Sequence, residues 1–291
     1  MKTLTKGITR AEALVSLTRR LERAGIESPE HDAEALLIRA LHVVRADLWV
    51  DPQAALSPGE ADELAALAER RTARVPLQLL LGTTPFGSAT LDLEPGVFIP
   101  RPETECLVEE VLRALPEASG RLLELGTGTG AIAVAILHEL PEWSGDAVDR
   151  SPQAVRLARR NAARNGLSER LRIYEGDFRH SERLRLPGQD YDLLVSNPPY
   201  IRSGDIDGLM PEVKDHDPRE ALDGGPDGLD ALRDLARGIP LWLRPGGLLA
   251  VEIGADQADE SRVLFGTVLE DARVLPDLAG RPRILIGTRS Q

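Results

Sequence analysis

The stretch LLELGTGTGAIAVAI, residues 122–136, constrains the fold of this chain more than any other segment. An apolar run ends at three glycines placed at every second position, and a second apolar run of small and branched residues follows. Glycine permits the positive φ angles of a tight turn and a close approach of a ligand to the backbone. The pattern predicts a strand, a glycine turn and a helix with free N–H groups at its start, although the glycines could form only a turn.

Strand and helix continue to alternate from residue 102 to the end of the chain. Strands are expected at residues 121–125, 145–149, 171–175, 191–196, 247–253, 274–275 and 283–286, with helices between most of them. This order predicts an α/β fold, with a mostly parallel, doubly wound sheet and helices on both faces. Ligands of such sheets bind at the carboxyl ends of the strands, so functional residues are expected there.

The first 83 residues read instead as short amphipathic helices. Thr9 with Glu12, and Ser57 with Glu60, have the spacing of a capping box in front of apolar positions. Beyond these helices, Gly and Pro punctuate β-type residues with no helical period. We therefore expect a helical bundle over 1–83, a β-hairpin linker over 84–101 and a catalytic domain over 102–291.

Acidic residues at strand ends suggest a nucleoside site beside the glycines. Asp149 ends the next strand, where a carboxylate can accept both hydroxyls of a ribose. Asp177 ends the third strand and can accept from an adenine amino group, and Phe178 can stack on the ring. Either acid alone could be a helix cap or a solvated acid.

The kind of nucleoside follows from what the glycine turn lacks. The spacing G-T-G-T-G differs from the G-x-G-x-x-G that binds a dinucleotide pyrophosphate, and no Walker lysine follows it. A nucleoside without a phosphate clamp points away from NAD and ATP. S-adenosylmethionine fits better, with its amino-acid tail on the backbone of the turn. The expected turn residues are Gly126, Thr127, Gly128, Thr129 and Gly130.

The fourth strand ends unusually, in VSNPPYI at 195–201. Two consecutive prolines remove two backbone donors and fix two φ angles directly after an asparagine. Asn197 can offer its side-chain oxygen, and Pro198 its carbonyl oxygen, to the two hydrogens of an –NH₂ group. An amide or exocyclic amine is a poor nucleophile, so orientation toward a methyl donor is the main lever on the rate. The alternative is that the segment is only a rigid turn.

The ordered set LELGTGTG, AVD, GD-aromatic and NPPY resembles class I (Rossmann-like), S-adenosylmethionine-dependent methyltransferases that modify planar nitrogens. Four more segments are very similar to the PrmC/HemK family of peptide chain release factor glutamine methyltransferases. They are VFIPRPETECLVEEVL at 97–112, DPREALDGGPDGLDALRDL at 217–235, VEIGADQ at 251–257 and DLAGRPR at 277–283. The similarity spans both domains, with one departure at Leu79, where the resemblance implies an aromatic residue.

The resemblance implies methylation of the glutamine amide in the GGQ motif of class I release factors, with the helical domain helping to dock that protein. It implies S-adenosylmethionine as cofactor and S-adenosylhomocysteine as product. The resemblance carries cofactor contacts to Gly126, Gly128, Gly130, Asp149 and Phe178. The other expected cofactor contacts are Thr127, Thr129, Asp177 and Asn197. Glutamine binding is carried to Asn197, Pro198, Pro199 and Tyr200, of which Asn197, Pro198 and Tyr200 are the catalytic candidates.

Charge bears on the class of partner. The formal net charge is −12, yet residues 1–83 carry 11 Lys and Arg against 12 Asp and Glu, so the acidity lies in the remainder. An acidic catalytic half repels nucleic-acid backbones and can steer a basic protein; the alternative is that it serves solubility alone. We expect a protein substrate, no direct nucleic-acid or membrane binding, and a monomer. The main alternative is a nucleic-acid adenine methyltransferase, and the second is a non-catalytic scaffold.

Four further expectations concern the cysteine, metal binding, the cellular location and Arg101. A single cysteine, Cys106, is expected to be a small buried side chain, and scattered histidines give no metal-ligand spacing, so no metal is expected. MKTLTKGITR at the start lacks the apolar core of a signal peptide, which predicts a cytoplasmic protein. Arg101, within IPRPETE, either belongs to an electrostatic cap of the next helix or to a wall of the cofactor pocket.

Overall fold

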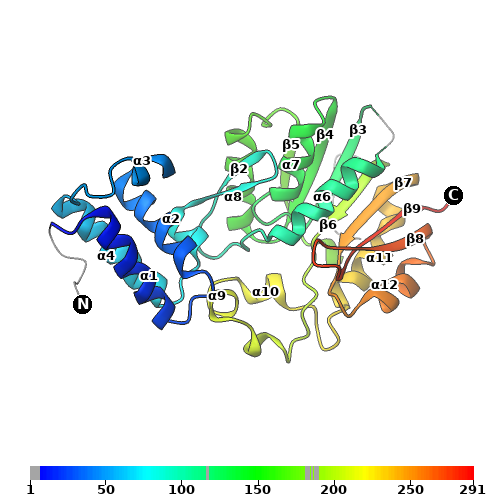
Figure 1. Ribbon diagram of the computed structural model, residues 1–291. Helices are drawn as coiled ribbons and strands as arrows, with labels where there is room; N and C mark the ends of the chain where they lie inside the picture. The colour runs from blue at the N-terminus through cyan, green and yellow to red at the C-terminus, as the bar shows by residue number, and fades with distance from the viewer. Residues whose placement is uncertain (1–6, 116–117, 181–183, 185, 187–189) are drawn as a thin grey trace. The chain divides into compact units, whose positions relative to one another are not determined.

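The computed structural model describes residues 7–115, 118–180, 184, 186 and 190–291 (Figure 1). The chain divides into two compact units. Unit 1 comprises Met1–Thr83 together with Met210–His216, and unit 2 comprises Thr84–Leu209 and Asp217–Gln291. Unit 1 is therefore assembled from two separate pieces of chain.

Unit 1 is a bundle of short helices. They are α1 (Arg10–Arg23), α2 (Pro29–Leu41), α3 (Arg45–Val50), α4 (Pro58–Thr72), α5 (Leu77–Leu81) and, from the second piece, α9 (Pro211–Lys214). The predicted capping boxes are present, since Thr9 Oγ1 accepts from Glu12 N at 3.2 Å and Ser57 Oγ accepts from Glu60 N at 3.3 Å. The apolar faces of α1, α2 and α4 meet in one core. Burial of these faces stabilises helices that would be too short to persist alone.

Unit 2 contains a seven-stranded sheet of order β5-β4-β3-β6-β7-β9-β8. Its strands are β3 (Gly120–Leu125), β4 (Trp143–Asp149), β5 (Leu171–Glu175), β6 (Tyr191–Ser196), β7 (Leu243–Glu252), β8 (Leu269–Pro276) and β9 (Pro282–Arg289). The pairs from β5 to β7 are parallel, and β9 is antiparallel to both β7 and β8. The predicted fold class is confirmed. The strands predicted at 247–253 and 274–275 are shorter than the observed β7 and β8. Pro245-Gly246-Gly247 has the sequence of a turn, which hid the start of β7, and β8 is a polar edge strand.

Helices cover both faces of this sheet. Leu122 packs in a cluster with α6 (Pro102–Ala114), α7 (Ala131–Glu139) and α8 (Pro152–Arg164). Leu123 and Leu125 pack in the other cluster, with α11 (Asp230–Trp242) and α12 (Ala258–Phe265). This alternation follows from the two-residue period of a strand. The hairpin of β1 (Thr83–Phe86) and β2 (Ala89–Asp92) adds Phe86 and Leu91 to the first cluster.

Three short elements complete the described chain: η1 (Phe178–His180), η2 (Ile206–Gly208) and α10 (Arg219–Leu222). None of the helices in the described ranges is long and apolar enough to cross a bilayer.

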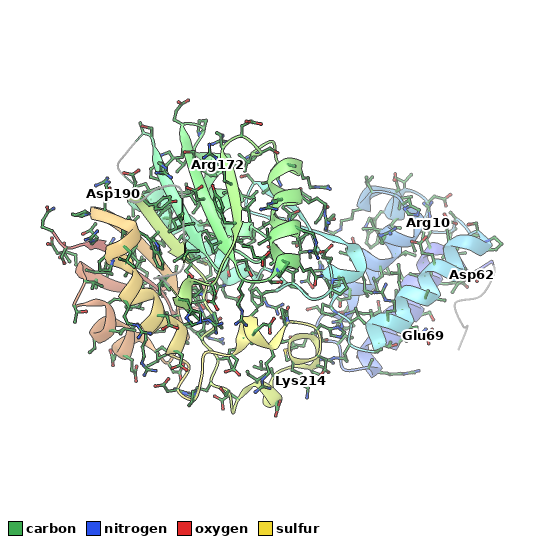
Figure 2. The ribbon with its side chains drawn as sticks, turned by 180° about the vertical axis from the view of Figure 1, so that it is seen from behind. Arg10, Asp62, Glu69, Arg172, Asp190 and Lys214 are labelled. Carbon is green, nitrogen blue, oxygen red and sulfur yellow. The ribbon has the colours of Figure 1, made fainter. Side chains whose placement is uncertain are left out.

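The sheet reverses its direction of growth beside β3. The chain adds β4 and β5 on one side of β3, and β6 then pairs with the other side. Leu125 at the end of β3 is in register with Val148 of β4 and with Ser196 of β6. The residues that follow these three strands therefore lie together at the carboxyl edge of the sheet, at its topological switch point. In Figure 2, Arg172 of β5 and Asp190, which precedes β6, mark the opposite, amino-terminal edge.

Candidate active site

The glycine turn after β3 has the geometry that its sequence predicted. Gly126, Gly128 and Gly130 have φ angles of 74°, 55° and 83°. The N–H groups of Gly126 and Thr127 donate to the carbonyl oxygen of Val148 at 2.8 and 3.0 Å, which ties the turn to β4. A Cβ atom at Gly128 would meet nothing within 4 Å, whereas one at Gly130 would lie 3.2 Å from Ala158 Cβ. Gly128 is thus open to a ligand, and Gly130 is needed for packing on α8.

Glu124, near the end of β3, forms hydrogen bonds to the glycine turn and to the start of α7. Its Oε2 accepts from Thr127 Oγ1 at 2.6 Å and from Ala133 N at 3.1 Å. Burial raises the pKa of Glu124 to about 8, because an apolar environment disfavours the charged form. Thr129 is also buried, and its carbonyl oxygen accepts from Asn161 Nδ2 at 2.8 Å. Glu124 was not among the residues predicted from the sequence, where its only signal is an acid inside an apolar strand.

Asp149, the last residue of β4, is also tied to the glycine turn. Its Oδ2 accepts from Gly128 N at 2.8 Å, and its Oδ1 accepts from Ser151 N at 2.8 Å. Burial raises the pKa of Asp149, partly opposed by these hydrogen bonds. Each carboxylate oxygen can accept a second hydrogen bond, so Asp149 retains the capacity to bind hydroxyl groups beside the turn.

Asp177 and Phe178 follow β5 on the neighbouring side. Asp177 Oδ2 accepts from Arg179 Nη2 at 2.7 Å, and Arg179 lowers the pKa of Asp177 although partial burial opposes the shift. Phe178 is buried in the same cluster as Leu125, and a Cβ at Gly126 would lie 3.6 Å from its ring. The structure therefore brings Phe178 to the glycine turn. The ion pair of Asp177 with Arg179 was not foreseen.

The Asn-Pro-Pro-Tyr segment leaves β6 beside the turn, with Pro198 buried and Pro199 half-buried. Asn197 Nδ2 donates to Thr104 Oγ1 at 3.1 Å, and Thr104 Oγ1 donates to Glu252 Oε2 at 2.7 Å. Tyr200 Oη donates to Glu252 Oε1 at 3.1 Å. Both polar side chains of the segment thus connect to one buried carboxylate at the end of β7.

Arg283 supplies positive charge next to this carboxylate. Burial raises the pKa of Glu252, while Thr104 and the charge of Arg283 oppose the rise. Arg283 Nη1 donates to Ile253 O at 3.1 Å and lies 3.4 Å from Tyr200 Oη. Burial and the charge of Glu252 raise the pKa of Tyr200, so the phenol stays protonated at neutral pH.

A glycine-rich loop after α10 packs against the backbone of the same segment. A Cβ at Gly224 would lie 2.9 Å from both Pro199 O and Tyr200 Cα, and one at Gly228 would lie 2.5 Å from Tyr200 O. Gln257 Nε2 also donates to Tyr200 O, at 2.9 Å. The four segments that carry the family resemblance therefore supply the supports of Asn197–Tyr200: Thr104, Gly224, Gly228, Glu252, Gln257 and Arg283.

Arg101 has a partner that neither sequence hypothesis included. It is the N-cap residue of α6, and its guanidinium pairs with the buried carboxylate of Asp217. Asp217 Oδ1 also accepts from Ile99 N at 3.1 Å. One carboxylate thus fixes both ends of the Ile99–Arg101 segment. Cys106, on the same helix, is buried as expected.

No three His, Cys, Asp or Glu side chains within the described ranges gather in a way that could hold a metal ion.

Comparisons with known proteins agree with this fold. Residues 12–82 match the family model for the PrmC N-terminal domain, and residues 90–211 match the methyltransferase small domain. A methyltransferase of known structure from Pyrococcus furiosus shares the fold, at 15% identity and a TM-score of 0.50 over 70% of this chain and 90% of that chain.

Full-length relatives are closer in sequence. A release factor glutamine methyltransferase from Moorella thermoacetica is 42% identical, covering 98% of this chain and 100% of that protein. One from Caulobacter vibrioides is 41% identical, covering 97% of each chain. Since these alignments extend over both units and nearly the whole chain, the chain belongs to the release factor glutamine methyltransferase family.

Proposed function

We propose that this protein transfers the methyl group of S-adenosylmethionine to the side-chain amide nitrogen of the glutamine in the GGQ motif of class I peptide chain release factors. The observation that carries the proposal is the position of Asn197. It leaves β6 beside the glycine turn of β3, and its amide nitrogen is already engaged by Thr104. The relatives that match both units, each named a release factor glutamine methyltransferase, support the same activity.

The residues at this edge of the sheet fit S-adenosylmethionine. The open backbone at Gly128 suits the amino-acid tail, Asp149 can accept ribose hydroxyls, and Phe178 offers an aromatic face for adenine. When bound, S-adenosylmethionine supplies a methyl group on a sulfonium. The proposed contacts are Gly126, Thr127, Gly128, Thr129, Gly130, Asp149, Asp177, Phe178 and Asn197.

The substrate amide is held by acceptors. Asn197 Oδ1 and the Pro198 carbonyl oxygen accept the two hydrogens of the glutamine –NH₂, and Pro199 keeps the intervening backbone stiff. Tyr200, fixed by Glu252, packs against the flat amide group. Orientation of this kind can contribute about 7–11 kcal/mol to lowering a barrier. Orientation matters most here because the lone pair of an amide nitrogen is delocalised, which makes the nitrogen a poor nucleophile.

The class of partner follows from charge. A chain of net charge −12 is better suited to a basic protein than to a nucleic-acid backbone, and the nearly neutral residues 1–83 offer no basic recognition region. Docking of the release factor by the helices of unit 1, a monomeric state and a cytoplasmic location belong to the same proposal.

One assay tests the chemistry. The protein is incubated with labelled S-adenosylmethionine and either a full-length release factor or DNA, and mass spectrometry locates the label. We expect the label on one glutamine. Asn197→Ala should lower turnover by about 100-fold or more while cofactor affinity changes little, because the lost acceptor acts mainly at the reacting centre. Label on adenine, or near wild-type turnover of Asn197→Ala, would contradict the proposal.

A further inference from the structure

The network beneath Asn197 determines which way its amide faces. Thr104 has one hydroxyl proton, and its Oγ1 lies 2.7 Å from Glu252 Oε2. Although burial raises the pKa of Glu252, the charge of Arg283 and the hydroxyls of Thr104 and Tyr200 favour its ionised form. A carboxylate has no proton to give, so Thr104 donates to Glu252, and the remaining capacity of its oxygen is to accept. The group of Asn197 at 3.1 Å from this oxygen must then be the donor, Nδ2. Asn197 Oδ1 is left on the other side of the amide, available to a ligand.

We propose that Thr104 and Glu252 are positioning residues for methyl transfer. The Glu252 carboxylate orients the Thr104 hydroxyl, the hydroxyl holds Asn197 Nδ2, and Asn197 Oδ1 is thereby presented to the substrate amide. This inference rests on the acceptor role of Asn197 proposed above.

Reversal of the network shows why its direction matters. A neutral, proton-donating group in place of the carboxylate could donate to Thr104, and Thr104 could then donate to Asn197 Oδ1. The Asn197 amide would turn over and present its –NH₂ to the –NH₂ of the substrate. Two donors facing each other cannot hydrogen-bond. A charged acceptor at position 252 prevents this arrangement.

The burial of these groups argues against a purely structural role. Glu252 is 1% exposed and lies between the buried apolar residues Val251 and Ile253 at the end of β7, and Thr104 on α6 is 3% exposed. Replacing a buried charge by a packed apolar group is often neutral or stabilising, so stability alone gives little reason for a carboxylate here. The same carboxylate also receives the Tyr200 hydroxyl, at 3.1 Å. It therefore fixes two side chains of one four-residue segment.

Three substitutions separate orientation from packing. Thr104→Val keeps the shape but removes the hydroxyl, Thr104→Ser keeps the hydroxyl, and Glu252→Gln replaces the carboxylate by a group that can donate. We expect Thr104→Val and Glu252→Gln to lower kcat by about 10- to 100-fold, the scale of a misplaced reacting group, with the KM for S-adenosylmethionine nearly unchanged. Thr104→Ser should restore most of the rate.

Ser261→Ala is the matched control. Ser261 is buried on α12, and its hydroxyl has no hydrogen-bond partner among the described residues. Loss of this hydroxyl should leave kcat unchanged, and thermal unfolding of every variant reports on packing. Wild-type kcat in Glu252→Gln, or a Thr104→Ser rate as low as that of Thr104→Val, would overturn the inference.

A double-mutant cycle tests whether Thr104 acts through Asn197. Single-turnover rates are measured for Thr104→Val, Asn197→Ala and the double variant. If Thr104 acts through Asn197, its substitution should have almost no further effect once Asn197 is gone. If the rate losses of the two single variants multiply in the double variant, the positioning role is wrong. Full activity in Asn197→Ala would instead defeat the proposed acceptor, so the two failures are distinguishable.

Discussion

Gly224 is the position where a single added carbon should disturb the site most directly. A Cβ there would lie 2.7 Å from Gly228 O and 2.9 Å from both Pro199 O and Tyr200 Cα. These three atoms belong to backbone, so no side-chain rotation can relieve the contacts. Reaching an ordinary separation of 3.4 Å requires a shift of 0.7 Å at Gly228 O and 0.5 Å at the other two atoms.

The loop cannot simply retract from the added carbon. Gly224 N donates to Ile201 O at 2.8 Å, and Asp230 N donates to Gly224 O at 2.9 Å. Moving Gly224 away would strain both bonds, so part of the displacement must fall on the Pro199 and Tyr200 backbone. Overpacking of this kind costs about 1–3 kcal/mol of folding free energy. A shift approaching 1 Å near the reacting atoms can lower the rate by about 100-fold.

Gly224→Ala should therefore lose activity beyond its loss of stability. Urea denaturation gives the change in unfolding free energy, and methyl transfer to a release factor gives kcat/KM at a temperature where the variant is folded. Gly204→Ala is the control, because a Cβ at this glycine would meet nothing within 4 Å. We expect a drop of about 10- to 100-fold for Gly224→Ala and little change for Gly204→Ala. Turnover of the two variants within about twofold of each other would refute the steric argument.

Three other perturbations have defined outcomes. Asp149→Ala should weaken S-adenosylmethionine binding by about 1–3 kcal/mol in calorimetry, through lost hydrogen bonds to a charged group; unchanged affinity would exclude the ribose contact. Folded Glu124 keeps a proton up to pH of about 8 that the unfolded chain releases near 4.5, so wild-type stability falls as pH rises between these values. Glu124→Gln removes this fall, and urea denaturation should show it gaining roughly 3–5 kcal/mol on wild type between pH 5 and pH 8; parallel pH profiles would count against the raised pKa. Glu212→Ala should lower the unfolding free energy by about 1–3 kcal/mol, because the buried Arg71 loses an acceptor at 3.0 Å; an unchanged denaturation midpoint would contradict this.

The sequence predicted which residues lie at the carboxyl ends of the strands, because strands and turns have recognisable local patterns. An apolar strand followed by GTGTG predicted the turn after β3, and Asn197 could be placed at a strand end because two prolines cannot continue a buried strand. The same reasoning placed Asp149 at the end of β4, and the structure has it there. Periodicity and turn residues thus determined which groups share the carboxyl edge.

The supports of the site could not be predicted from local patterns. Thr104 lies 93 residues from Asn197 and 148 residues from Glu252 in the chain, and their hydrogen bonds exist only once α6 and β7 have packed. The resemblance marked the segments that contain these residues but gave no physical reason for them. That reason is contact with the Asn-Pro-Pro-Tyr segment, which only tertiary structure reveals.

The composition of unit 1 from two pieces of chain has a practical consequence for dissecting this protein. Glu212 contacts Arg71 at 3.0 Å and Arg74 at 2.6 Å, and Arg71 also contacts Asp32 at 2.7 Å. A fragment that contains only residues 84–291 lacks both arginine partners of Glu212. A fragment that contains only residues 1–83 lacks the carboxylate that Arg71 and Arg74 contact. Neither cut yields an intact module. A chimera with a relative would have to take both Met210–His216 and the amino-terminal helices from the same parent protein.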